Sequence, residues 1–241
     1  PTLNTSTLAA FVAAGAGVPV AKHGNRSASG RCGSLDVLEA LGANVELDPD
    51  AVSALLRRSG FTFANARAHH PALGRLGPLR KALGFRTVFN LLGPMLSPAR
   101  VRRQLLGVSD PRLAPVMAGA LARLGRERAW IVAGPGGLDE IGLHGVTAVW
   151  KVEGSKLTED RIDPAALGLG GDPSEIRGGD VEANARRFVA VLAGEDRGAA
   201  RDHVALNAGA ALVVAGAAED LARGLELARA TLDGGAALRC F

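Results

Sequence analysis

Apolar residues fall into short runs whose lengths and flanking residues predict helices along much of the chain. In Leu35–Leu41, for example, Ser34 is placed to cap the run and Gly42 to stop it. The run Leu8–Ala14 follows Asn4-Thr5-Ser6-Thr7, which is rich in side chains that cap helix starts. The same reasoning predicts helices over Asp50–Ser59, Leu113–Leu124, Arg201–Ala215 and Ala218–Leu232, with helical character from Val181 to the end.

Shorter β-prone runs alternate with these helices. Val18–Ala21 is predicted to be a strand, and Lys22-His23-Gly24-Asn25-Arg26 a loop that follows it. Later strands are predicted over Gln104–Val108, Ala129–Ala133, Ala148–Val152 and Lys156–Thr158, the last two as a hairpin. This alternation predicts an α/β fold with a central sheet flanked by helices. No repeat and no second domain boundary is visible, so residues 1–241 are expected to form one domain.

The composition excludes several classes of protein. Of the 241 residues, 47% are hydrophobic and 22% charged, which suits a folded core and argues against a disordered or collagen-like chain. The apolar segment Leu8–Ala21 is short for a membrane span and is interrupted by glycines and Pro19, so no membrane association is expected. Cys32 and Cys240 cannot make a disulfide scaffold, and we therefore expect a cytoplasmic protein.

Charge is divided unevenly along the chain. The net charge of +4 combines +8 over residues 1–109 with −4 over residues 110–241. No acidic residue occurs from Ala51 to Ser109, and the bases of this stretch are Arg57, Arg58, Arg67, Arg75, Arg80, Lys81, Arg86, Arg100, Arg102 and Arg103. Such a run favours a partner with several negative charges, such as a pyrophosphate or a nucleic acid. Few aromatic residues accompany it, which argues against a stacking platform for single strands.

Two segments have the composition of a phosphate site. Asn4-Thr5-Ser6-Thr7 stands at a predicted helix start, where free backbone N–H groups attract anions. Lys22–Gly30, followed by Gly33 and Ser34, gathers cations, hydroxyls and glycines between a strand and a helix. The simpler alternatives are an ordinary cap and an exposed polar loop. The scarcity of acids nearby favours phosphate binding for the second segment.

A carboxylate pair, Asp139 and Glu140, follows the predicted strand Ala129–Ala133. Adjacent carboxylates repel each other unless a cation lies between them, and Mg²⁺ prefers such ligands when it bridges to phosphate oxygens. A turn with two solvated acids is the alternative. The other titratable candidates have no partner that the sequence reveals: His69, His70, His144 and His203.

Taken in order, these motifs resemble the anthranilate phosphoribosyltransferase family. The matching motifs are Asn4-Thr5-Ser6-Thr7, Lys22-His23-Gly24-Asn25-Arg26, Gly33 to Gly42, His70-Pro71-Ala72, Arg86 to Pro94 and Gly137-Leu138-Asp139-Glu140. The resemblance runs over essentially the whole chain. It implies a phosphoribosyltransferase α/β domain of the kind shared with pyrimidine nucleoside phosphorylases, normally present as a homodimer.

The resemblance also implies substrates and residue roles. The substrates would be anthranilate and phosphoribosyl pyrophosphate, with Mg²⁺, in tryptophan biosynthesis. Phosphoribosyl pyrophosphate would be bound by Asn4, Ser6, Thr7, Lys22, His23, Gly24, Asn25, Arg26, Ser27, Ala28, Ser29, Gly30 and Ser34. The metal ions would be held by Ser6, Asp139 and Glu140, and anthranilate by Asn25 and Arg80. An aromatic amine is already a free nucleophile near neutral pH, so no general base is nominated.

The chain also departs from the family pattern. The family's Gly-Thr-Gly-Gly-Asp-Gly loop would stand directly before Pro1, after a small helical domain, and neither is among the 241 residues. We therefore expect little or no activity from these residues alone. Gly30 stands where many relatives have serine, and Ala133 where many have histidine, and both are interpreted as variation.

Three other functions remain open at this stage. A nucleic-acid-binding relative of the same fold would suit the basic first part, although it would not need Asp139 and Glu140. Nucleoside phosphorolysis is a second possibility, against which Asn25 and Arg80 argue. A non-catalytic scaffold is the third.

Overall fold

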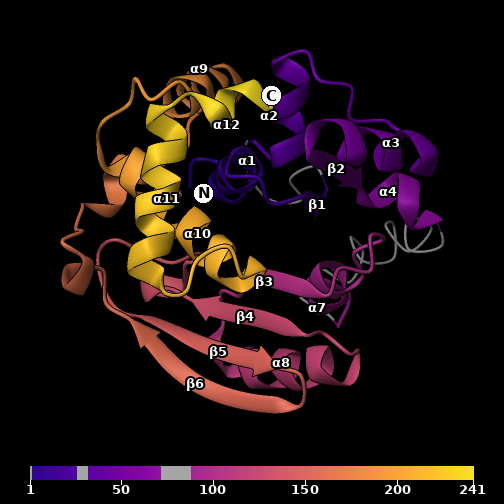
Figure 1. Cartoon of the computed structure of the whole chain (residues 1–241), viewed down its shortest axis with the longest axis vertical. Coiled ribbons are helices and arrows are strands. Elements are labelled where there is room, and N and C mark those ends of the chain that lie inside the picture. The colour runs from indigo at the N-terminus through magenta and orange to yellow at the C-terminus, as the bar shows by residue number, and fades with distance from the viewer. Residues whose placement is uncertain (1, 26–31, 72–87) are drawn as a thin grey trace.

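Two sheets, with helices between and around them, make up the fold (Figure 1). The computed structural model describes residues 2–25, 32–71 and 88–241. In this part of the chain, β1 (Val20–Gly24) and β2 (Phe61–Asn65) form a parallel pair. A second sheet has the order β3 (Arg103–Gly107), β4 (Arg128–Ala133), β5 (Thr147–Glu153) and β6 (Lys156–Ile162). Its first pair is parallel and its other two pairs are antiparallel.

The helices connect the strands and cover the sheets. In the described residues they are α1 (Thr5–Gly15), α2 (Ser34–Ala40), α3 (Pro49–Ser59), α4 (Ala66–His69), α7 (Val88–Met95), α8 (Ala114–Arg123), α9 (Val181–Leu192), α10 (Ala199–Ala215), α11 (Leu221–Asp233) and α12 (Ala236–Arg239). No helix among them is both long enough and apolar enough to cross a membrane.

The core is centred on α1 and α10, which pack against each other in the middle of the molecule (Figure 1). Leu8 to Ala14 are all buried, and Phe11 stacks on Phe61 of β2 with ring centroids 3.9 Å apart. The opposite face of the larger sheet is covered by α8, whose Met117 and Leu121 join a second apolar cluster. Since α1 and α10 are buried nearly all round, their polar residues Thr5, Thr7, His203 and Asn207 lie in the interior.

The predicted α/β class is confirmed, and so are most predicted elements. The two helices expected from Arg201 and Ala218 begin at Ala199 and Leu221, and the predicted hairpin is present as β5 and β6. The second hairpin strand extends to Ile162, four residues further than predicted. Its residues from Lys156 to Arg161 are all exposed, so they lack the buried positions by which a strand is recognised.

The predicted loop over Lys22–Arg26 is wrong for its first three residues, which belong to β1. Lys22, His23 and Gly24 pair in register with Phe63, Ala64 and Asn65 of β2. That partner strand was not predicted. Its five residues are all buried, and in this short run only Phe61-Thr62-Phe63 is β-prone.

The start of α2 also differs from the prediction. Ser34 is the first helical residue, and Gly33 occupies the cap position. The Asp36 carboxylate accepts a hydrogen bond from the Gly33 N–H at 2.7 Å, which ties the first turn of the helix back to its cap residue. The Ser34 hydroxyl is thereby left for a contact with α1.

Candidate functional site

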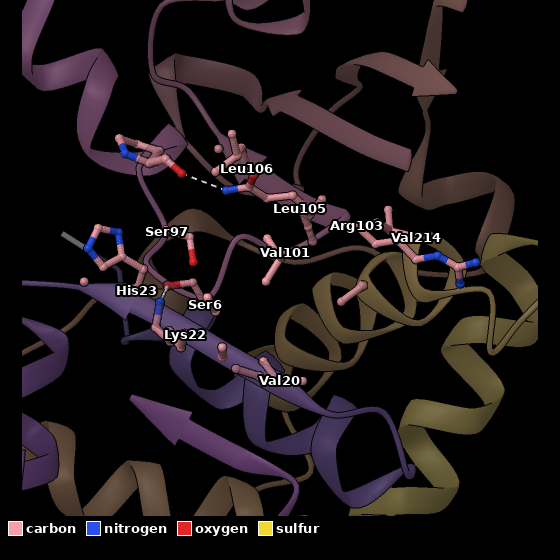
Figure 2. Close-up of a pocket in the computed structure, with 18 of the residues that line it drawn as sticks. Ser6, Val20, Lys22, His23, Ser97, Val101, Arg103, Leu105, Leu106 and Val214 are labelled. Carbon is pink, nitrogen blue, oxygen red and sulfur yellow. Dashed lines mark hydrogen bonds between the residues drawn. The ribbon is translucent and has the colours of Figure 1, made fainter. Parts of the chain in front are cut away.

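An open cavity of about 1470 Å³ lies between β1 and β3, and residues of α1 and α10 also line it (Figure 2). Ser6, Lys22 and His23 line it on one side, and the segment from Gly93 to Leu106 lines it on another. Asp139 and Glu140 also reach the cavity, together with Asn207 of α10. The cavity therefore brings together polar groups from distant parts of the sequence.

The first turn of α1 presents hydroxyls that are not used as helix caps. Asn4 is the cap residue of α1 but makes no side-chain capping bond, contrary to expectation. Ser6 is exposed to the cavity, and its Oγ accepts a hydrogen bond from Lys22 Nζ at 3.1 Å (Figure 2). Thr7 is buried and donates through Oγ1 to Ser34 Oγ at 2.8 Å. The hydroxyls thus connect α1 to β1 and α2.

The parallel pairing of β1 and β2 sets the position of the next predicted residues. Both strands end at the same edge, where ligands commonly bind in α/β folds. Lys22, His23 and Gly24 lie at the end of β1, and Asn25 follows them as an exposed residue that lines the cavity. Burial lowers the pKa of Lys22 to about 8, and the charges of Glu140 and Asp139 act in the opposite direction.

The two carboxylates are held against the ends of β3 and β4. A Cβ atom on Gly107 would lie 1.6 Å from the Asp139 carbonyl oxygen, and one on Gly134 would lie 2.3 Å from that of Glu140. Only glycine allows the backbone to approach so closely at these positions. Asp139 is exposed, whereas the Glu140 side chain is only 11% exposed. Burial, followed by the charge of Asp139, raises the pKa of Glu140 to about 7.

Helix α10 contributes two polar residues that sequence reasoning did not assign to the site. Asn207 hydrogen-bonds both the N–H and the C=O of Ile141, the residue after Glu140. For His203, whose partners the sequence does not reveal, the structure supplies them: its Nδ1 lies 3.3 Å from Thr5 Oγ1 and its Nε2 lies 3.8 Å from Glu140 Oε2. No local signal could have revealed these contacts, because they join residues more than sixty positions apart.

The segment from Gly93 to Ser97 forms another wall of the cavity. Gln104 Nε2 donates to the Pro94 carbonyl at 2.7 Å, and Arg126 Nη2 donates to the Met95 carbonyl at 3.4 Å. His70 Nε2 lies 2.8 Å from the Leu96 carbonyl oxygen, and its ring meets that of His23 edge-on, with centroids 5.2 Å apart. Three side chains therefore satisfy carbonyls that the end of α7 leaves free.

The predicted site residues are partly brought together. Ser6, Lys22, His23, Gly24, Asn25, Asp139 and Glu140 line the one cavity. Asn4, Thr7 and Ser34 do not line it; Asn4 and Thr7 lie at the start of α1 beside Ser6, and Ser34 is hydrogen-bonded to Thr7. The remaining candidates lie outside the described residues: Arg26, Ser27, Ala28, Ser29, Gly30 and Arg80.

The residues present fit a magnesium ion. Within the described ranges no three or more His, Cys, Asp or Glu side chains form a metal-binding group. Mg²⁺ does not require one, since it is usually bound through one or two carboxylates, with waters and substrate phosphates completing its shell. Glu140 Oε2 is buried without a hydrogen-bond partner in the described structure, and a cation would satisfy it.

Comparisons with known proteins agree with this geometry. The sequence profile of the "Glycosyl transferase family, a/b domain" matches residues 1–238. An anthranilate phosphoribosyltransferase of Rubrobacter xylanophilus is 52% identical over 238 residues, which cover 98% of this chain and 70% of that protein. The crystal structure of the Thermus thermophilus enzyme of the same name superposes with a TM-score of 0.93 at 44% identity, covering 99% of this chain and 71% of that one.

A structure determined with substrate is also similar. Anthranilate phosphoribosyltransferase from Saccharomyces cerevisiae, in complex with phosphoribosyl pyrophosphate (PRPP) and Mg, superposes with a TM-score of 0.92 at 31% identity. The match covers 99% of this chain and 68% of the yeast chain. Fold, cavity, motifs and relatives agree, and the chain belongs to the anthranilate phosphoribosyltransferase family.

Proposed function

We propose that the cavity between β1 and β3 carries out the reaction of this family. The protein transfers the phosphoribosyl group of phosphoribosyl pyrophosphate to the amino group of anthranilate, a step of tryptophan biosynthesis that yields phosphoribosylanthranilate and pyrophosphate. One observation carries the proposal. Ser6 and Lys22 line the same cavity as Asp139 and Glu140, so a cation and a metal-binding carboxylate pair can act on one pyrophosphate.

The donor substrate would bind along the ends of α1 and β1. Lys22 Nζ and Ser6 Oγ already contact each other, and both can turn toward phosphate oxygens. Departure of pyrophosphate from the ribose C1 builds negative charge on the leaving group, which a preorganised cation stabilises. Asn4, Thr7, His23, Gly24 and Ser34 would shape this side, and the proposal extends to Arg26, Ser27, Ala28, Ser29 and Gly30 on the family motif alone.

The metal would be held by Ser6, Asp139 and Glu140. When bound, Mg²⁺ supplies positive charge that neutralises the pyrophosphate oxygens. Asp139 is exposed and can reach a metal–substrate complex directly. Glu140 is buried beside it, and its unpartnered Oε2 supports a role as an oxygen ligand.

Anthranilate would approach from the side of Asn25, with its carboxylate paired to Arg80. A guanidinium can bind a carboxylate through two parallel hydrogen bonds. The anthranilate amine is uncharged near neutral pH and attacks C1 without prior loss of a proton. Positioning of the two substrates then supplies much of the rate, and no residue needs to act as a strong base.

We also propose a domain organisation, an oligomeric state and a cellular location for the protein. Residues 1–241 act as one phosphoribosyltransferase α/β domain, which the match of the family profile over residues 1–238 supports. The working protein is a homodimer. It acts in the cytoplasm, which is consistent with Cys32 and Cys240 both being free thiols.

The proposal is tested by following the loss of anthranilate fluorescence in the presence of phosphoribosyl pyrophosphate and Mg²⁺. We expect the full-length polypeptide to show turnover that requires all three components and stops with EDTA. Uridine with phosphate, and a DNA duplex at physiological salt, are the comparison ligands. Phosphorolysis without anthranilate turnover, or low-nanomolar DNA binding without turnover, would contradict the proposal in favour of a relative with a changed site.

A further inference from the structure

The peptide that follows Glu140 is held by one buried side chain, that of Asn207. Asn207 Oδ1 accepts a hydrogen bond from the Ile141 N–H at 2.9 Å, and its Nδ2 donates to the Ile141 carbonyl at 3.0 Å. The same Nδ2 donates to the His203 carbonyl, one turn earlier in α10, at 2.9 Å. Asn207 is 4% exposed, so the amide group is fully used by backbone partners within the core.

Regular secondary structure does not set the direction of the carboxylate segment. Residues 138–146 form neither helix nor strand. Before Glu140, the Gly134 N–H donates to the Leu138 carbonyl at 2.7 Å. After it, the Gly142 N–H donates to Thr147 Oγ1 at 3.1 Å. Asn207 holds the chain between these two anchors, at the peptide that joins Glu140 to Ile141.

The same turn of α10 also contacts the Glu140 side chain. Thr5 Oγ1, which donates to the Leu3 carbonyl at 2.6 Å, lies 3.3 Å from His203 Nδ1. This contact fixes the imidazole with Nε2 directed toward Glu140 Oε2, 3.8 Å away. Asn207 also bonds the His203 carbonyl. Helix α10 therefore positions both the backbone after Glu140, through Asn207, and the Glu140 side chain, through His203.

We infer that Asn207 is a positioning residue that directs the Glu140 carboxylate toward the metal. The inference rests on the proposed function, since it takes Glu140 to be a metal ligand. Groups that orient metal ligands commonly change metal affinity by ten- to hundredfold when removed. A residue needed only for stability would lower the melting temperature and leave the affinity of the folded protein unchanged.

The test compares two substitutions at Asn207 with a control on the same helix. Asn207→Ala and Asn207→Leu both remove all three hydrogen bonds, and the second keeps a side chain of similar volume. Val213→Ala is the matched control, because Val213 is 7% exposed in α10 and does not line the cavity. Mn²⁺ binding in the presence of pyrophosphate, measured by electron paramagnetic resonance, reports the site without turnover. Hydrogen exchange at the Ile141 amide reports directly whether the hydrogen bond from Ile141 N–H to residue 207 is present.

Both Asn207 variants are expected to weaken Mn²⁺ binding by about tenfold or more and to accelerate Ile141 exchange, with Val213→Ala within about twofold of the parent. Unchanged Mn²⁺ affinity in a folded Asn207 variant overturns the inference. Loss of fold in both variants also overturns it, since Asn207 would then be a folding residue. Glu140→Gln separates the proposed metal site from the positioning role of Asn207. If Glu140→Gln binds Mn²⁺ as the parent does, Glu140 is not a metal ligand and the proposed metal site is wrong. If Glu140→Gln weakens Mn²⁺ binding and the Asn207 variants do not, only the positioning role is wrong.

Discussion

Glu140 Oε2 lies 3.8 Å from His203 Nε2, and neither atom has a hydrogen-bond partner among the residues that the structure describes. The His203 side chain is 1% exposed. Burial lowers the pKa of His203 to about 4 and raises the pKa of Glu140 to about 7. At neutral pH the imidazole is therefore uncharged, while the carboxyl group is near its midpoint and readily gives up its proton to a cation.

These shifts predict how stability depends on pH in the absence of metal. Glu140 binds its proton more tightly when folded, so its contribution to stability is complete below pH 4.5 and is lost as pH rises through about 7. His203 binds its proton less tightly when folded, so its contribution has the opposite sign and grows between about pH 4 and 6.5. The free energy of unfolding, measured with urea in EDTA between pH 4.5 and 7.5, gives the sum of the two contributions.

Substitutions separate the two contributions. Glu140→Gln should make stability rise more steeply with pH than in the parent, by an amount on the order of 3 kcal/mol across the window. His203→Asn should make it rise less steeply. Parallel curves for the parent and Glu140→Gln would mean that Glu140 titrates normally, and the burial argument would then be wrong.

Lys22 is predicted to act on the pyrophosphate-bearing substrate. Lys22→Gln removes a charged donor worth about 1.5–3 kcal/mol, so the KM for phosphoribosyl pyrophosphate should rise by about tenfold or more. The melting temperature should not fall, because burial opposes the Lys22 charge in the absence of ligand. Lys151→Gln is the matched control, since Lys151 pairs with Asp160 on the larger sheet, outside the cavity. An equal rise in the KM for anthranilate would argue against the assigned role.

Sequence patterns were sufficient for the elements that carry their own local signals. The hairpin of β5 and β6 turns at Gly154, which has a positive φ of 59°, and α11 is amphipathic with a capping Asp220. By contrast, β2 carries only a weak local signal, Phe61-Thr62-Phe63, in a run of five buried residues. The loop predicted over Lys22–Arg26 was wrong for Lys22, His23 and Gly24, because these residues are typical of a loop and yet pair with β2.

The site could be predicted where its functional residues are neighbours in the sequence. Lys22 to Asn25 and the Asp139–Glu140 pair were found as motifs, and they line one cavity. Asn207 and His203 were missed, because each acts through residues far away in the chain. A buried asparagine in an alanine-rich helix has the same sequence appearance whether it holds a catalytic segment or only fills the core.

Arg126 is predicted to hold the wall of the cavity formed by the end of α7. This residue is 8% exposed and its guanidinium donates to Gln104 Oε1 at 3.2 Å, and Gln104 in turn donates to the Pro94 carbonyl. Arg126→Met leaves the acceptors of Arg126 without a donor and should cost about 2–4 kcal/mol of stability. Because Pro94 lies on this wall, turnover should fall as well. Arg123→Met, an exposed position in α8, should change neither quantity.

Gly107 is predicted to be essential because it lets β3 touch the carboxylate segment. An added Cβ would lie 1.6 Å from the Asp139 carbonyl oxygen, so Gly107→Ala must displace Asp139 and Glu140 or bend β3. Such overpacking should cost at least about 1–3 kcal/mol and reduce Mg²⁺-dependent turnover by about tenfold or more. Gly119→Ala is the matched control, since the nearest atom to its Cβ would be 4.0 Å away, and replacing a helical glycine should stabilise by about 0.5–1 kcal/mol. If Gly107→Ala retained parental stability and metal dependence, β3 would not fix the position of the carboxylates.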